Sequence, residues 1–181
     1  MTGMASQRVA VVGVGIMGSA IARRLLDCGH CVTGFDPDRA KLAGLAAAGA
    51  LAATSTARAT AESELVITSL NSAAIAQGAV FGGAGVAEGA EPADGSRLLI
   101  DMSSITPPAT RDFATALRER CSMGWVDAPQ SGGAPKALPR QLTVMAGGSE
   151  NDVNRARRVM DSLCANYTHM ARRAPARPPS W

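Results

Sequence analysis

"RVAVVGVGIMGSAIARRLLDCG", residues 8–29, is the stretch that decides the fold. Its short β-branched run, ended by glycines, is typical of a buried strand. The apolar side chains that follow, from Ile16 to Cys28, recur at helical spacing, and Gly29 stands where a helix C-cap is expected. The stretch therefore predicts a strand, a glycine turn and a helix in direct succession.

Three glycines of this turn follow the spacing G-x-G-x-x-G. We expect Gly13 to permit the tight turn, Gly15 to let a pyrophosphate approach the N–H groups at the helix start, and Gly18 to let helix and strand pack closely. In this strand–helix context the spacing indicates a dinucleotide site, although a glycine turn that binds nothing has the same pattern. The residues predicted to contact the dinucleotide here are Gly13, Val14, Gly15, Ile16, Met17 and Gly18.

The predicted second strand, residues 30–36, ends in Asp36, about 20 residues beyond the glycines. An acid in this place accepts hydrogen bonds from the ribose hydroxyls and repels a 2′-phosphate, which favours NAD over NADP. Asp36 could also cap the helix that follows, and the two roles are compatible. Arg39 lies close enough in the sequence to keep NADP as an alternative.

Strands and helices alternate along the rest of the chain. Further strands are predicted at residues 63–70, 97–102, 124–129 and 141–148, and helices at 37–49, 56–62, 72–81, 107–121 and 149–165, the last with Ser149 as N-cap. This alternation predicts an α/β fold with a doubly wound, mainly parallel Rossmann sheet. We expect one NAD(P)-binding domain over residues 8–166, a disordered N-terminus over residues 1–7 and a loop with one turn of structure over residues 82–95.

Composition and charge narrow the classes of function. The 181 residues carry a formal net charge of +3, and residues 172–181 hold three arginines and no acid, so the body is nearly neutral and no nucleic-acid partner is expected. No apolar run approaches the ~20 residues that span a bilayer, and residues 1–8 do not resemble a signal peptide, so we expect a soluble, cytoplasmic protein.

The sequence has four cysteines, and two of them, Cys28 and Cys31, form a C-x-x-C pair. A redox pair needs its first cysteine at a helix N-terminus, whereas Cys28 ends a predicted helix. A zinc site would need two further ligands at suitable spacing, which the sequence does not offer. We therefore predict structural thiols near a turn and no metal site.

Four segments in the same order resemble motifs of the β-hydroxyacid dehydrogenase family. That family includes 3-hydroxyisobutyrate dehydrogenase, tartronate semialdehyde reductase and 6-phosphogluconate dehydrogenase. The segments are "VVGVGIMGSAIARRL" at residues 11–25, "IDMSSITP" at 100–107, "DAPQSGG" at 127–133 and "GGAPKALPRQLTVMAGG" at 132–148. They depart from the family pattern at Val14, Ile21, Arg24 and Gln130.

The resemblance implies an oxidoreductase that transfers a hydride between NAD(P) and the hydroxyl carbon of a small 2- or 3-hydroxy acid. Tartronate semialdehyde with glycerate, or 3-hydroxyisobutyrate, would be such a substrate. The resemblance also implies roles for six residues. Leu70 and Asn71 would flank the cofactor, Ser104 would touch the nicotinamide ribose, and Ser131, Gly132 and Gly133 would hold the substrate carboxylate.

The family's general acid–base is a lysine on a helix beyond the Rossmann domain, where a second, all-helical domain begins. This chain has only Lys41 and Lys136, and neither stands at that position, so no catalytic residue is predicted. If the family motif is written in GC-rich codons, deleting one base after the Met170 codon yields residues 171–181, including their end. We therefore predict a frameshifted chain with a disordered tail over residues 167–181, no helical domain, and impaired turnover.

Two further expectations follow from this reading. A missing partner domain would expose an apolar face through which the chain could self-associate. The alternative function is a dinucleotide-binding fragment without turnover of its own.

Overall fold

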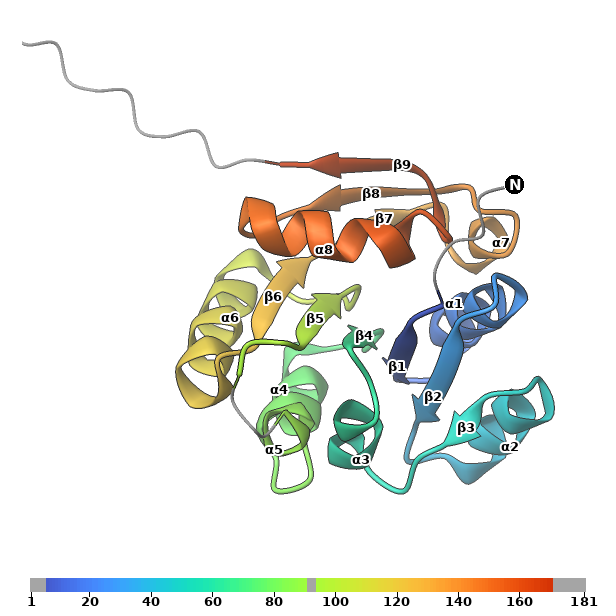
Figure 1. Ribbon diagram of the computed structural model, residues 1–181, viewed down its shortest axis with the longest axis horizontal. Helices are drawn as coiled ribbons and strands as arrows, with labels where there is room; N and C mark the ends of the chain where they lie inside the picture. Colours follow the sequence, from blue (N-terminus) through green and yellow to red (C-terminus); the bar gives the residue numbers. More distant parts are fainter. Residues whose placement is uncertain (1–5, 91–93, 171–181) are drawn as a thin grey trace, which may run out of the picture.

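The computed structural model describes residues 6–90 and 94–170. These residues form a parallel sheet of order β3-β2-β1-β4-β5-β6 with helices on both faces (Figure 1). The strands are β1 (Arg8–Val12), β2 (Cys31–Phe35), β3 (Leu51–Ala52), β4 (Leu65–Thr68), β5 (Leu98–Asp101) and β6 (Gly124–Asp127). The helices are α1 (Ile16–Asp27), α2 (Arg39–Ala47), α3 (Thr56–Ala61), α4 (Ala73–Phe81), α5 (Val86–Gly89), α6 (Pro107–Cys121), α7 (Ala134–Ala137) and α8 (Glu150–Met160). The predicted doubly wound α/β fold is confirmed.

The strands are apolar along their length because both faces of the sheet are covered. In β1, Val9 and Val11 face a core formed with α1 and α8, whereas Ala10 and Val12 face a second core formed with α3, α5 and α6. Since successive side chains of a strand point to opposite faces, a run of small and β-branched residues fills both cores.

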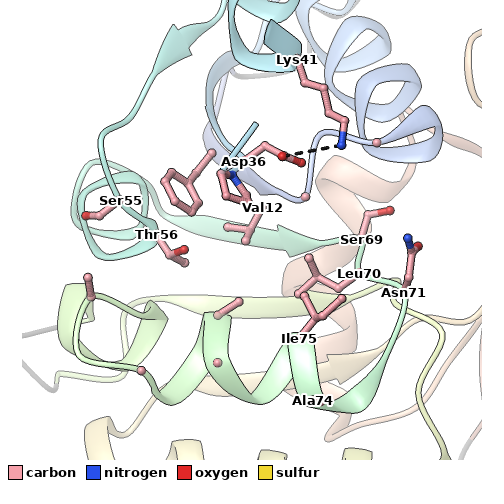
Figure 2. Close-up of a pocket in the computed structure, with 18 of the residues that line it drawn as sticks. Val12, Asp36, Lys41, Ser55, Thr56, Ser69, Leu70, Asn71, Ala74 and Ile75 are labelled. Atoms are coloured by element: carbon pink, nitrogen blue, oxygen red, sulfur yellow. Dashed lines mark ion pairs between the residues drawn. The ribbon is translucent and has the colours of Figure 1, made fainter. Parts of the chain in front are cut away.

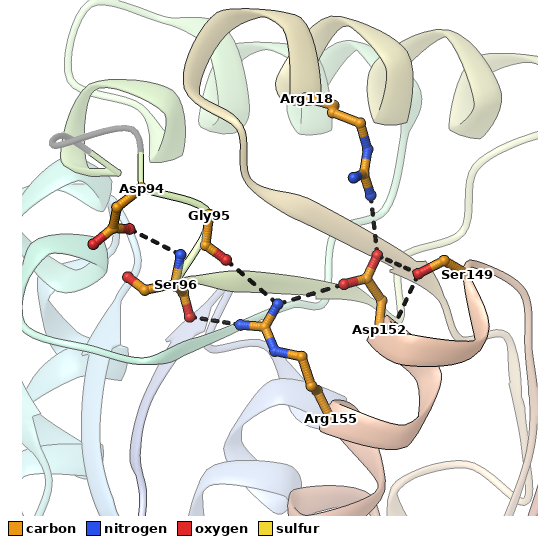
Figure 3. A network of polar contacts seen from close by, with 7 residues as sticks. All are labelled: Asp94, Gly95, Ser96, Arg118, Ser149, Asp152 and Arg155. Atoms are coloured by element: carbon orange, nitrogen blue, oxygen red, sulfur yellow. Dashed lines mark hydrogen bonds and ion pairs between the residues drawn. The ribbon is translucent and has the colours of Figure 1, made fainter.

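A buried carboxylate joins α8 to its surroundings (Figure 3). Asp152 accepts hydrogen bonds from Arg118 on α6 at 3.0 Å and from the Ser149 hydroxyl at 2.7 Å, and Arg155 lies 3.4 Å away. Ser149 also accepts from the Asp152 N–H, so it is the predicted N-cap of α8. Arg155 in turn donates to the Gly95 carbonyl, which fastens α8 to the turn before β5.

A second, three-stranded sheet of order β7-β8-β9 follows the first. It consists of β7 (Gln130–Ser131), β8 (Leu142–Ala146) and β9 (Cys164–His169), with β7 antiparallel and β9 parallel to β8. Strand β9 was not predicted, because we assigned residues 149–165 to one helix and residues 167–181 to a disordered tail, whereas α8 ends at Met160 and β9 begins at Cys164.

Both predicted ends of the domain need correction. Strand β9 continues to His169, so residues 167–169 belong to the folded domain; its backbone N–H and C=O groups pair with β8. At the other end, Ser6 donates to the Gly29 carbonyl and the Gln7 N–H donates to His30, so these two residues are ordered as well. The predicted disorder of residues 1–5 and 171–181 lies outside the described residues.

The cysteine pair has the position that was predicted. Cys28 is the C-cap of α1, Cys31 is the first residue of β2, and both are free thiols. Within residues 6–90 and 94–170, no group of His, Cys, Asp and Glu side chains could hold a metal ion. No helix in these segments is long and apolar enough to cross a membrane.

Candidate functional site

A cavity of about 660 Å³ opens at the carboxyl ends of β1, β2 and β4 (Figure 2). Its size lies within the range of small-molecule and cofactor sites. The glycine turn after β1 forms its floor, Asp36 and Pro37 line it after β2, and Leu70 and Asn71 line it after β4. The chain order reverses here, since β1 has β2 on one side and β4 on the other, and such a switch point is where open α/β sheets bind ligands.

Two of the three glycines are required by the fold itself. Gly13 has a φ of +89°, and a Cβ there would lie 2.4 Å from the Ser69 carbonyl oxygen. A Cβ on Gly18 would lie 1.8 Å from the Gly13 carbonyl oxygen. The tight turn and the close helix–strand packing predicted for these two glycines are therefore both present.

Gly15 is different, because neither its backbone nor its packing requires glycine. Its φ is −74°, which any residue adopts, and a Cβ would meet nothing within 4 Å. It is the N-cap residue of α1, and no side chain forms a capping hydrogen bond with the N–H groups at this helix start. Gly15 also lines the cavity. The first N–H groups of a helix have no acceptor within the helix, so this side of the cavity is a place where an anion can come close to backbone donors.

Asp36 is nearly buried at the end of β2, with 7% of its surface exposed. Its Oδ2 accepts from the Val14 N–H at 2.8 Å and its Oδ1 from the Asp38 N–H at 2.9 Å. The alternative that Asp36 caps the next helix is wrong, because Asp38 is the N-cap and α2 begins at Arg39. The carboxylate thus ties the glycine turn to the start of α2 while it lines the cavity.

The other end of the cavity is held by hydrogen bonds between the ends of β4 and β5. The Leu70 N–H donates to the Ser103 hydroxyl at 3.0 Å, and the Ser104 N–H donates to the Leu70 carbonyl at 2.9 Å. Asp101 fixes this arrangement, because its Oδ1 accepts from the Thr68 hydroxyl and from the Ser103 N–H. Ser104 is therefore beside the cavity, although it does not line it.

The predicted substrate loop lies apart from this cavity. Ser131 is the last residue of β7, and Gly132 and Gly133 connect it to α7. All three are exposed, and the two glycines have φ values of 117° and 64°. None of the three lines the cavity. Nearby, burial and then the charge of Asp101 raise the pKa of the Asp127 carboxyl above its ordinary value.

The structure thus separates the predicted site residues into two groups. The cavity brings together Gly13, Gly15, Asp36, Leu70 and Asn71. The residues that do not line it are Val14, Ile16, Met17, Gly18, Ser104, Ser131, Gly132 and Gly133. The contacts predicted for each residue remain predictions.

The sequence reasoning missed four parts of the chain that line the cavity. Residues 54–56 follow β3, a strand of only two residues, and residues 82–84 belong to the stretch predicted as a loop. Lys41 and the α4 residues Ala74 and Ile75 also line it. The helical periods of α2 and α4 predict that these residues lie near the ends of the strands. They do not predict which of these side chains faces the cavity.

The polar contacts of the two lysines are with residues other than Ser104. Lys41 Nζ is 3.8 Å from Asp36 Oδ1, at the β2 side of the cavity (Figure 2). Lys136 is on α7, where it donates to Gln141 at 3.1 Å, and it does not line the cavity.

Comparisons with known proteins agree with this architecture. The family model described as the NAD binding domain of 6-phosphogluconate dehydrogenase matches residues 8–171. A probable 3-hydroxyisobutyrate dehydrogenase of Mycobacterium tuberculosis is 35% identical over 161 residues, which are 89% of this chain and 52% of that protein. An NAD-dependent L-serine dehydrogenase of Pseudomonas aeruginosa is 32% identical over 163 residues, 90% of this chain and 53% of that protein.

The same relationship is seen in solved structures. The Mycobacterium tuberculosis 3-hydroxyisobutyrate dehydrogenase with L-serine has a TM-score of 0.84 and 32% identity, over 91% of this chain and 54% of that one. The chain spans about half the length of the curated relatives it matches. With its glycine turn, its strand order and this match over nearly all of its described residues, the chain belongs to the β-hydroxyacid dehydrogenase family and has the fold of that family's NAD-binding domain.

Proposed function

We propose that this chain is the cofactor-binding half of a dehydrogenase that acts on a small 2- or 3-hydroxy acid. The observation that carries the proposal is Gly15, a glycine that lines the cavity although the fold does not require it. A bound pyrophosphate does require it, because a side chain there would stand between the phosphates and the helix N–H groups. The relatives named as 3-hydroxyisobutyrate and L-serine dehydrogenases support the substrate class.

The nicotinamide cofactor would supply the hydride chemistry, and the residues of this chain would position it. Asp36 would accept hydrogen bonds from the adenosine ribose. Leu70, Asn71 and Ser104 would flank the nicotinamide end, held by the hydrogen bonds between β4 and β5. Tartronate semialdehyde with glycerate, and 3-hydroxyisobutyrate, are the substrates to test.

The carboxylate of the substrate would be held by the loop of Ser131, Gly132 and Gly133. This assignment rests on the family resemblance and on two features of the loop. Its residues are exposed, and both of its glycines have positive φ values, a backbone conformation that other residues rarely adopt.

A second candidate function is cofactor binding without turnover. The positions of the two lysines favour it, since Lys41 lies beside Asp36 and Lys136 lies on α7, away from the cavity. General acid–base catalysis contributes roughly 10²–10⁴-fold to a rate, so a chain that lacks the group would turn over slowly at best.

Two measurements test these functions. Isothermal titration calorimetry with NAD and NADP measures binding, and absence of heat with both cofactors would refute the binding function. Formation of reduced cofactor from 3-hydroxyisobutyrate or glycerate measures turnover. Binding without turnover supports the second candidate, whereas turnover at a rate typical of enzymes, about 1–10³ s⁻¹, would exclude it.

We further propose that the chain self-associates and that it works in a reducing cytoplasm. Leu138, Met145 and Met170 are 45–55% exposed in or beside the second sheet, and exposed apolar side chains favour contact with another surface. Cys28 and Cys31 are free thiols, which suits a reducing compartment. Light scattering after gel filtration tests self-association: a monomer at all protein concentrations would contradict it.

A further inference from the structure

We propose that a second cavity, at the opposite ends of the strands from the dinucleotide cavity, binds a small phosphate monoester whose organic part carries hydroxyl groups. This second cavity, called here the α8 cavity, has a volume of about 440 Å³. Its lining residues come from α8 and from the amino ends of β1, β4 and β5. It shares no lining residue with the dinucleotide cavity, so the inference does not depend on the proposed function.

One wall of the α8 cavity is a row of hydrogen-bond donors on the helix. The row consists of Asn151, Asn154, Arg155 and Arg158, whose spacing of i, i+3, i+4 and i+7 places them on one side of α8. The side chain of Arg158 is exposed and makes no hydrogen bond or ion pair with the described residues, so its five N–H donors are available to an anion. A guanidinium binds two phosphate oxygens at once, and the neighbouring amides can donate to the third.

Arg155 adds a second, fixed positive charge to this wall (Figure 3). Its Nη1 lies 3.5 Å from the Gly95 carbonyl oxygen and 3.4 Å from Asp152 Oδ1, and its Nη2 donates to the Ser96 carbonyl oxygen. Its Nε makes no hydrogen bond with the described residues, so one donor remains for a ligand. Asp152 also accepts from Arg118 at 3.0 Å, so its one negative charge offsets that of Arg155 only in part.

The opposite wall, at the starts of the strands, offers acceptors. The Glu64 carboxylate is 48% exposed and lies 3.1 Å from the Arg8 guanidinium, which offsets its charge and leaves it able to accept from a hydroxyl. Gln7 Oε1 is shielded from water and has no donor among the described residues. Such an unpaired acceptor is unfavourable, and rotation of the Gln7 side chain into the cavity that it lines would let it accept from a ligand hydroxyl. Asp94 accepts the Ser96 N–H at 2.8 Å and does not line the cavity.

The two walls together define the class of ligand. The donors of α8 belong to several side chains, which suits the three acceptor oxygens of a phosphate better than the two of a carboxylate. The acceptors at the strand starts suit hydroxyl groups, which donate hydrogen bonds. A volume of about 440 Å³ lies within the range of small-molecule sites, so the organic part of the ligand fits beside its phosphate.

The experiment measures by isothermal titration calorimetry how tightly the full chain binds glycerol 3-phosphate, inorganic phosphate and acetate. We expect glycerol 3-phosphate to bind with a dissociation constant of about 1 mM or lower. Inorganic phosphate should bind about fivefold more weakly because it lacks the organic hydroxyls, and acetate more weakly still. Arg158→Met should weaken the binding of glycerol 3-phosphate at least about tenfold, the effect of one charge-assisted contact.

Two further variants sharpen the test. Arg23→Met is the matched control, since Arg23 is exposed on α1 and lines neither cavity, and it should change binding less than about twofold. Gln7→Ala should reduce the binding of glycerol 3-phosphate to the level of inorganic phosphate and leave inorganic phosphate unchanged. The backbone N–H that donates to His30 is kept in that variant.

Three results would overturn the inference. The first is no binding of glycerol 3-phosphate to the natural chain, and the second is acetate binding as tight as that of inorganic phosphate. The third is binding that Gly15→Ala abolishes and Arg158→Met retains, because the phosphate would then occupy the dinucleotide cavity. Titration of the same samples with NAD keeps the two proposals apart: a chain that binds glycerol 3-phosphate through Arg158 but binds no NAD supports this inference and refutes the proposed function. Circular dichroism confirms that each variant is folded.

Discussion

Replacing Gly15 with alanine separates cofactor binding from folding, because this glycine is the one of the three that the fold does not need. A Cβ on Gly15 meets nothing within 4 Å, and the φ of −74° suits alanine. Alanine is a poorer N-cap than glycine, but it also restricts the unfolded chain, and these effects are similar in size and opposite in sign. We expect the free energy of unfolding to change by less than about 0.5 kcal/mol.

Gly18→Ala is the matched comparison within the same motif. Its Cβ would lie 1.8 Å from the Gly13 carbonyl oxygen, a backbone atom that can move only with the turn. Overpacking of this kind costs about 3 kcal/mol. For a chain of this length that cost corresponds to a fall of about 6–12 °C in the unfolding midpoint.

Thermal unfolding with and without NAD measures both effects. At a concentration about 100 times the dissociation constant, NAD stabilises the natural chain by about 2.7 kcal/mol, or about 5–11 °C. Gly15→Ala should unfold at the midpoint of the natural chain without cofactor and gain little from NAD, whereas Gly18→Ala should unfold early even without cofactor. If Gly15→Ala is stabilised by NAD as much as the natural chain, the pyrophosphate does not bind at this helix start and the reasoning fails.

Three other substitutions test particular contacts. Asp152→Ala should lower the free energy of unfolding by about 2–3 kcal/mol in urea, because two arginines and a capping hydroxyl lose their acceptor; Arg158→Ala on the exposed surface of α8 is the control and should change it little. Burial lowers the pKa of His30 below 6.5, and the neutral ring accepts the Gln7 N–H at Nδ1. The stability that His30 contributes is therefore present above pH 6.5 and is lost as the pH falls through the lowered pKa. His30→Asn should flatten the pH dependence of unfolding in this range, and an unchanged slope would contradict the assignment. Asp101→Ala should weaken NAD binding, measured by calorimetry. The Ser103 N–H would lose its acceptor, and Ser103 is the residue whose hydroxyl holds the Leu70 N–H.

Local signals in the sequence were sufficient for the dinucleotide fold and for part of the cavity. The glycine spacing, the β-branched run before it and the helical period after it each depend on a few neighbouring residues, and the structure confirms all three. Leu70 and Asn71, whose role the family resemblance implied, line the cavity just after β4.

Pairing between distant segments accounts for what the sequence did not reveal. Strand β3 has two residues and β9 lies in a stretch with alternating polar side chains, so each is a strand only because a neighbouring strand takes up its hydrogen bonds.

The β-branched run, the glycine turn and the helix after it were determined by the sequence alone, because turn geometry and helical period are properties of neighbouring residues. The tertiary structure decided what each site residue can do. It shows that Gly13 and Gly18 serve the fold while Gly15 is free to serve a ligand, and that Asp36 faces the cavity with its oxygens already engaged. The contact of Gly13 with Ser69 and that of Asp36 with the Val14 N–H join segments that lie far apart along the chain and become neighbours only when the parallel strands align.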